Sequence, residues 1–217
     1  MPATATLCPG NFRERIGIAL DIAERALTVL AQAWDDTSPD CPTFRREKFV
    51  CETALLLYAA AAVVENESEL GHRIRGVARC LASHARSEEI GATIRIRPAM
   101  TAELSVAHAC LSAIGAPDPG FDTLLQRIES SDYPIPERVP WKDVERDWLG
   151  RICPVFERVP EIERSIGRTT LATGLDVLSG RREELYAFTH ALIYLCDFGR
   201  AAMEPPRPVT EILLDAD

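Results

Sequence analysis

Residues 49–64 read FVCETALLLYAAAAVV, and this apolar run dictates the architecture that we expect for the chain. A helix formed here presents apolar side chains on all sides, which is typical of a helix surrounded by protein. The uninterrupted apolar part, residues 54–64, is too short to span a bilayer. We therefore expect a helix over 43–64, with Thr43 as its N-cap, at the centre of the fold.

Amphipathic segments lie on both sides of this central run. Apolar residues repeat at intervals of three and four, the period of a helix, in most of the remaining chain. The predicted helices span residues 11–34, 98–115, 121–130, 141–152 and 182–198, with further helical segments after Pro160. Another helix is predicted from residue 69, because Asn66 and Glu69 have the spacing of a capping box. Residues 87–98 are predicted to be extended loop, and the proline-rich stretch 133–140 cannot be helical.

These segments predict an all-α protein, built as a single domain of packed helical hairpins over residues 1–217. Residues 1–10 form a loose arm. The sequence Glu52-Thr53-Ala54-Leu55-Leu56 resembles Thr189-His190-Ala191-Leu192-Ile193, as expected of stacked hairpins in an α/α toroid or a solenoid. Coincidence between helices rich in alanine and leucine explains the similarity equally well.

The last segment, residues 209–217, is apolar and follows three prolines. It is too short to be a stable helix by itself, so it is either the start of a further helix or a docking segment. We therefore expect a homo-oligomer or a second chain that completes the fold.

Composition and charge restrict the classes of partner and the compartment. The formal net charge of −9 disfavours a protein that binds nucleic acid, because such a protein must neutralise phosphates. Residues 1–15 lack a basic segment followed by an apolar run, so no secretory signal is predicted, and we expect no membrane partner. The seven cysteines form no Cys-x-x-Cys pair, which fits free thiols in the cytoplasm.

The functional hypothesis rests on a stripe of polar side chains along the predicted helix 182–198. At 100° per residue, one face of the predicted helix 182–198 holds Glu183, Tyr186, His190, Tyr194 and Asp197. Such side chains must face water, bond to each other or line a cavity, because burying them without partners is costly. An imidazole beside phenols and a carboxylate can transfer protons near neutral pH. An ordinary core histidine and tyrosines with hydrated hydroxyls are the structural alternative.

Further candidates are assigned to substrate binding. His108 lies on a similar stripe of the predicted helix 98–115, and Tyr186 and Thr189 flank His190. Glu52 is a fourth candidate, although Lys48 at i−4 explains it equally well as an ordinary ion pair. Cys80 and His84 have ligand spacing but no matching second pair, so no metal is predicted. Phosphate-binding and dinucleotide-binding glycine motifs are absent from the sequence, and we expect no cofactor.

The segment Thr189-His190-Ala191-Leu192-Ile193-Tyr194-Leu195-Cys196-Asp197-Phe198-Gly199 resembles the signature of an actinobacterial family of unknown function. In that family a Thr-His-Ala-x-x-Tyr-x-x-Asp-Phe-Gly motif recurs, and residues 52–56 are similar to its earlier helix. The resemblance extends from about residue 45 onward, and Cys196 replaces a small polar residue such as threonine. It implies an all-helical protein encoded near specialised-metabolite gene clusters, with longer members and no established activity.

Two hypotheses follow. In the first, the chain is a cofactor-free enzyme of specialised metabolism that binds an apolar or peptidyl intermediate in a helical cavity. His190 is then the general acid/base, Asp197 and Tyr194 orient it or hold the substrate, and the reaction is a cyclisation, isomerisation or hydrolysis. In the second, the chain is a non-catalytic interaction or scaffold protein, and the polar stripe is a hydrogen-bond network that confers specificity.

Overall fold

A computed structural model describes residues 9–32, 46–131, 133, 138–156, 162–175, 181–202 and 204–216. Within these residues the protein is all-α, with no strand, as the periodicity predicts. The contacts divide the chain into two compact units, residues 1–92 with 104–118 and residues 93–103 with 119–217. None of the described helices is long and apolar enough to cross a membrane.

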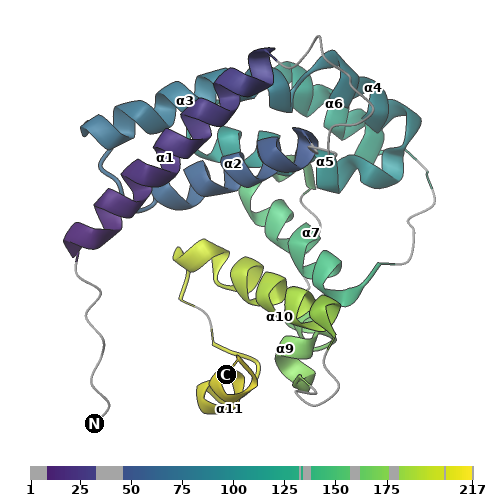
Figure 1. Cartoon of the computed structure of the whole chain (residues 1–217). Helices are drawn as coiled ribbons and strands as arrows, with labels where there is room; N and C mark the ends of the chain where they lie inside the picture. Colours follow the sequence, from purple (N-terminus) through teal and green to yellow (C-terminus); the bar gives the residue numbers. More distant parts are fainter. Residues whose placement is uncertain are drawn as a thin grey trace. The chain divides into compact units, whose positions relative to one another are not determined.

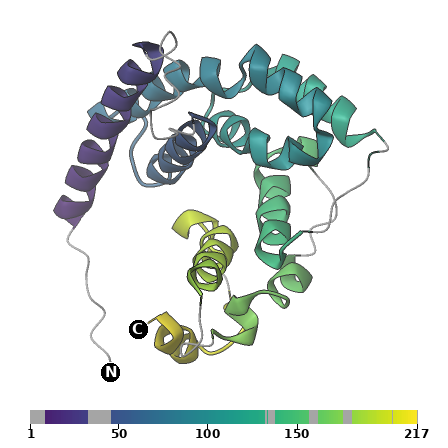
Figure 2. The same cartoon turned by 45° about the vertical axis from the view of Figure 1, so that its right-hand side comes forward.

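The first unit is built on three helices that pack against one another, α1 (Pro9–Gln32), α2 (Arg46–Ala61) and α3 (Glu69–Ala85). Figures 1 and 2 show them side by side. From Thr53 to Ala61 no side chain of α2 is exposed, as predicted for a helix surrounded by protein. The helix ends at Ala61, three residues before the predicted end at Val64, and Val63 is exposed. Thr43, its predicted N-cap, lies outside the described residues, as do residues 1–8 of the predicted arm.

The N-cap of α3 differs from the predicted one. Ser68, not Asn66, caps the helix, and its hydroxyl accepts a hydrogen bond from the backbone N–H of Gly71 at 3.1 Å. Asn66 and Glu69 have the spacing of a capping box, but Ser68 is next to the first helical residue, where its hydroxyl reaches the free N–H groups.

The predicted extended loop over 87–98 is wrong, because residues Glu88–Ile96 form a helix, α4. Ser87 begins it, since its hydroxyl accepts from the N–H of Ile90 at 3.3 Å. Glu88 and Glu89 in the first turn and Arg95 in the last turn favour the helix dipole. The alternating pattern of residues 93–97 suggested extended chain, but these end effects favour a helix.

A short 3₁₀ turn, η2 (Pro98–Met100), leads into α5 (Thr101–Ala113), and Gly115 follows with a φ of 93°. This agrees with the predicted helix from Pro98 to Gly115. Every residue of α5 from Ser105 to Leu111 is buried. This part of α5 is thus buried on all sides, and it includes the polar residues Ser105 and His108.

The second unit is built around α7 (Pro140–Ile152) and α10 (Arg182–Leu195), which pack against each other. Both views place the two helices side by side (Figures 1 and 2). The remaining elements are α6 (Pro119–Glu129), η3 (Pro154–Phe156), α8 (Ile162–Ile166), α9 (Thr170–Thr173), η4 (Asp197–Gly199) and α11 (Val209–Ala216). Residues 134–137 of the proline-rich stretch lie outside the described residues.

Helix α10 ends three residues earlier than predicted. Asp197 and Phe198 have φ values of 48° and 55°, in the left-handed region, so they cannot continue a right-handed helix. Gly199 follows with a φ of 81°. Asp197-Phe198-Gly199 is therefore a turn after the helix, and Asp197 is not on the helical face that holds Tyr186, His190 and Tyr194.

Candidate functional site at the interface of α7 and α10

Tyr194 lies at the buried centre of the interface between α7 and α10. Its hydroxyl donates a hydrogen bond to Oε1 of Glu145, at 2.7 Å, and both side chains are buried. Lys142, one turn earlier on α7, donates to the other oxygen, Oε2, at 2.7 Å. Both oxygens of this buried carboxylate thus have donors, and its charge is compensated by Lys142.

Asp197 bonds to α7 about one turn beyond Glu145, at Trp148. The indole Nε1 of Trp148 donates to its Oδ1 at 2.7 Å, and the guanidinium Nε of Arg200 lies 3.8 Å from its Oδ2. The Phe198 ring packs with its centre 5.4 Å from that of Trp148 and 5.8 Å from that of Tyr194. A left-handed conformation costs a residue with a Cβ roughly 1–2 kcal/mol. The contacts with Trp148 offset that cost and hold the turn in place.

His190 lies where the interface reaches the surface. Its ring stacks on that of Tyr186, with centres 3.7 Å apart, and the Trp141 ring of α7 lies 5.0 Å away. Nδ1 of His190 lies 2.8 Å from the carbonyl oxygen of Tyr186. Because a carbonyl oxygen only accepts, Nδ1 is the donor of this hydrogen bond, and Nε2 is the ring nitrogen that it leaves unused.

Aromatic rings therefore follow the whole interface, from Trp141, Tyr186 and His190 at the surface to Tyr194, Trp148 and Phe198 inside. Lys142 also lies over the Trp141 ring, with Nζ 4.6 Å from its centre, in a cation–π contact. The structure thus pairs Tyr194 and Asp197 with α7, and it leaves His190 half-buried among aromatic rings. Chemically, the arrangement offers one imidazole beside an amphipathic aromatic surface.

The remaining predicted site residues are not part of this interface. Thr189 is exposed on α10, and its hydroxyl donates to the Leu185 and Tyr186 carbonyls of the preceding turn. Glu52 and His108 belong to the first unit. Glu52 is exposed on α2 and lies 3.6 Å from Lys48, as the ion-pair alternative predicts.

His108 is fully buried in α5. Its Nδ1 accepts a hydrogen bond from Nε of Arg86, at 2.9 Å. Arg86 is the C-cap residue of α3, so this bond connects α3 with α5. Arg86 also donates to the carbonyl of Ala116 just after α5. Arg86 thus links the C-terminal end of α3 to His108 of α5 and to the chain just after α5.

The α7 residues of the site were not predicted from the sequence. Trp141, Glu145 and Trp148 recur at i, i+4 and i+7, so they share one face of α7, and this spacing was visible in the sequence. Glu145 was not singled out because an acidic residue in a charged helix is usually solvated. Its burial depends on contacts with α10, which is distant in the sequence.

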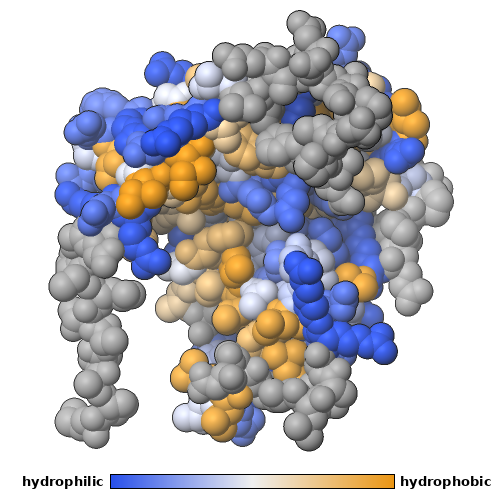
Figure 3. Space-filling view, in the orientation of Figure 1, coloured by the Kyte–Doolittle hydropathy of each residue, from blue (hydrophilic) through white to orange (hydrophobic). Residues whose placement is uncertain are grey.

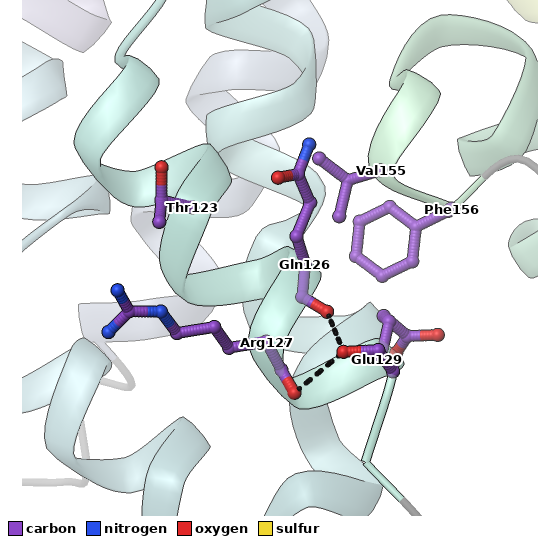
Figure 4. A pocket seen from close by; sticks show the side chains of 7 residues that line it. Thr123, Gln126, Arg127, Glu129, Val155 and Phe156 are labelled. Atoms are coloured by element: carbon purple, nitrogen blue, oxygen red, sulfur yellow. Dashed lines mark hydrogen bonds between the residues drawn. The ribbon is translucent and has the colours of Figure 1, made fainter.

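A surface pocket lies elsewhere in the second unit, between α6 and η3 (Figure 4). Its volume is about 600 Å³, and none of the predicted site residues lines it. The wall consists of Thr123, Gln126, Arg127, Glu129, Ser130, Val155 and Phe156. The hydroxyl of Ser130 donates to the backbone carbonyls of Gln126 and Arg127 in the last turn of α6.

Residues 17–216 match the family model DUF6895, a domain of unknown function. The chain belongs to this family. The match includes α7, α10 and the Asp197–Gly199 turn, so the whole α7–α10 interface lies inside the DUF6895 domain. No curated protein and no solved structure shows significant similarity to the chain.

Proposed function

We propose that this DUF6895 chain is a non-catalytic helical interaction protein, which assembles with a second copy of itself through the outer face of α10. The observation that carries the proposal is the distribution of apolar residues around this helix. The face toward α7 buries Phe188, Ala191, Tyr194 and Leu195. The opposite face exposes Leu185 and Leu192, and Tyr186 lies at its edge, with its ring centre 5.5 Å from that of Trp141 on α7. Helix α10 is therefore apolar on both sides.

The outer face of α10 is defined here as Leu185, Tyr186, Thr189, Leu192, Ile193 and Cys196. Leu185 is 51% exposed and Leu192 38% exposed, and these six residues carry no charge, while the exposed Arg182 projects from the same side one turn before Leu185. Figure 3 shows apolar side chains gathered over α10. A helix that is apolar all round is normally covered by protein, and contiguous apolar surface of this kind is typical of interaction sites.

A second copy fits this face for two reasons. In a two-fold dimer the same surface contributes from both subunits, so an uncharged face can pair with itself without placing like charges opposite each other. The chain carries a net charge of −9, which opposes self-association through most other surfaces.

The polar stripe of α10 supports the same proposal. Tyr194 and Asp197 bond to Glu145 and Trp148 of α7, so their side chains fix how α10 packs. A satisfied polar network specifies one register between helices, because any shift leaves buried groups unpaired. The network would thus hold the outer face of α10 in one orientation for its partner.

Native mass spectrometry of the full chain tests the proposal. The unaltered chain is expected to give a dimer, and the double variant Leu185→Gln/Leu192→Gln a monomer with the same helical circular dichroism. Ile22→Gln is the control, because Ile22 is an exposed apolar residue on α1 and is not part of the outer face of α10. A monomeric unaltered chain, or a double variant that still dimerises, would overturn the proposal.

His190 supports a second candidate function, the cofactor-free enzyme of specialised metabolism. The bond from Nδ1 to the Tyr186 carbonyl orients the imidazole with Nε2 available for proton transfer. In this candidate the Thr189–Gly199 motif marks an actinobacterial family of cytoplasmic biosynthetic proteins, and Trp141 and Tyr186 hold an apolar or peptidyl intermediate. The variant His190→Ala separates the candidates. Lost product in the producing strain with an unchanged melting temperature and native mass favours catalysis, whereas lost assembly favours the interaction protein.

A further inference from the structure

A second polar cluster of the same unit lies between the end of α6 and α7. It consists of Glu129, Tyr133, Arg138 and Arg146. Nη2 of Arg146 donates to Oε2 of Glu129 at 2.5 Å, and the Tyr133 hydroxyl donates to Oε1 at 3.0 Å. Both oxygens of this carboxylate are therefore engaged within the cluster.

Arg146 retains an unused donor. Its side chain is only 13% exposed and that of Glu129 9% exposed, so the pair is removed from water. Nη1 of Arg146 is buried, and among the residues that the structure describes it has no hydrogen-bond acceptor. Leaving a buried charged donor without an acceptor is costly, so such a group indicates a missing partner.

Arg138 adds a second cation that is not neutralised. It is half-buried, and within the described part of the chain it forms no hydrogen bond or ion pair. Burial lowers the pKa of its guanidinium, and the charge of Arg146 lowers it further, although Tyr133, Asp143 and Glu129 act in the opposite direction. Asp143 itself lies 3.6 Å from Arg168. The cluster thus has more positive than negative charge.

We propose that Arg138 and Arg146 form a binding site for an oxyanion, either a carboxylate or a phosphate group of a small molecule. A guanidinium presents parallel N–H donors that match the oxygens of these groups. Solvent reaches Arg138, so an anion binds there first, and Nη1 of Arg146 supplies the second contact. The anion would satisfy the unused donor and neutralise the charge that burial makes unfavourable.

The neighbouring pocket indicates where the rest of the ligand lies. Glu129 belongs both to the cluster and to the wall of the pocket in Figure 4. The volume of that pocket, about 600 Å³, falls within the usual range for small-molecule sites. Val155 and Phe156 give one side of it an apolar surface. The ligand class is therefore a small molecule with an anionic group at one end.

Thermal unfolding and calorimetric titration with inorganic phosphate and with acetate test the site, in buffers matched for ionic strength with sodium chloride. The variant Arg138→Gln is the central one, because it removes a cation that forms no hydrogen bond or ion pair with the described residues. Without added anion it should melt at or above the temperature of the unaltered protein. With anion it should lose the rise in melting temperature that the unaltered protein shows.

Arg151→Gln is the matched control, since it removes the same charge from an exposed position of α7. It should keep the anion-dependent rise. Arg138→Lys keeps the charge but not the paired donors, so its affinity should fall about tenfold. If only phosphate raises the melting temperature, the ligand carries a phosphate group. If acetate raises it as well, the site also accepts carboxylates. No response to either anion, or an equal response in Arg138→Gln, would overturn the proposal.

Discussion

The indole Nε1 of Trp148 donates a hydrogen bond to Oδ1 of Asp197, 2.7 Å away, and so anchors the turn that ends α10 to the middle of α7. Asp197 and Phe198 both have positive φ, an unfavourable conformation for residues with a Cβ. Strain of this kind persists only where surrounding contacts enforce it. The Asp-Phe-Gly segment is therefore a structural element of the α7–α10 interface.

Two substitutions of Asp197 should differ in their effect on stability. Asn keeps an oxygen acceptor for the indole and tolerates positive φ, so Asp197→Asn should retain most of the free energy of unfolding. Asp197→Ala removes the acceptor beside a fully buried indole and should cost about 1–3 kcal/mol. Urea unfolding followed by circular dichroism measures both values. Equal stabilities for the two variants would mean that the turn does not depend on the Trp148 bond.

Tyr194 and Glu145 should show energetic coupling. Removing the hydroxyl in Tyr194→Phe takes one donor from a buried carboxylate, and the free energy of unfolding should fall by about 1–3 kcal/mol. A double-mutant cycle with Glu145→Gln should give a coupling of about 0.5–3 kcal/mol, as expected for residues in direct contact. Tyr186→Phe is the control, because the Tyr186 side chain is exposed on the same helix. Additive effects of the two changes would contradict the hydrogen bond.

His84 should make the first unit less stable at mildly acidic pH. Its Nδ1 lies 2.8 Å from Nη2 of Arg46, and since a guanidinium only donates, Nδ1 must be an unprotonated acceptor. Burial, and secondarily the charge of Arg46, lower the pKa of His84 in the folded state. As the pH falls below about 6.5, the unfolded chain therefore binds a proton that the folded chain does not, and stability decreases.

Urea unfolding at a series of pH values measures this effect. His84→Gln should remove part of the decrease below about pH 6.5, because glutamine accepts from Arg46 without titrating. Arg46→Gln should reduce the decrease by less, since burial is the larger cause of the lowered pKa. If His84→Gln kept the full pH dependence of the unaltered protein, the role assigned to His84 would be wrong.

Apolar runs and helical periodicity predicted most of the fold, because burial of apolar side chains dominates the choice of helix in 49–64, 98–115 and 182–198. They failed where local end effects dominate. Residues 93–97 alternate in polarity, yet the hydroxyl of Ser87 and the charges at both ends of α4 favour a helix. The left-handed Asp197 and Phe198 could not be predicted either, since contacts with Trp148 stabilise that conformation and the spacing of residues along α10 does not encode them.

The candidate site was predictable only on one of its two helices. Spacing along 182–198 placed Tyr186, His190 and Tyr194 on one face, and all three contribute rings to the interface. The partners on α7 are separated from them by some fifty residues of chain, as with Glu145 and Tyr194. A periodic pattern gives the direction of a side chain relative to its own helix, and it does not specify which helix covers it.

We propose that the chain self-associates through the outer face of α10, which includes Leu185 and Leu192. Sedimentation velocity of the unaltered full chain, over a wide range of concentration, tests this claim most directly. We predict a sedimentation coefficient that rises with concentration to the value of a dimer, and a constant monomer value for Leu185→Gln/Leu192→Gln. A monomer at every concentration of the unaltered chain would contradict the account.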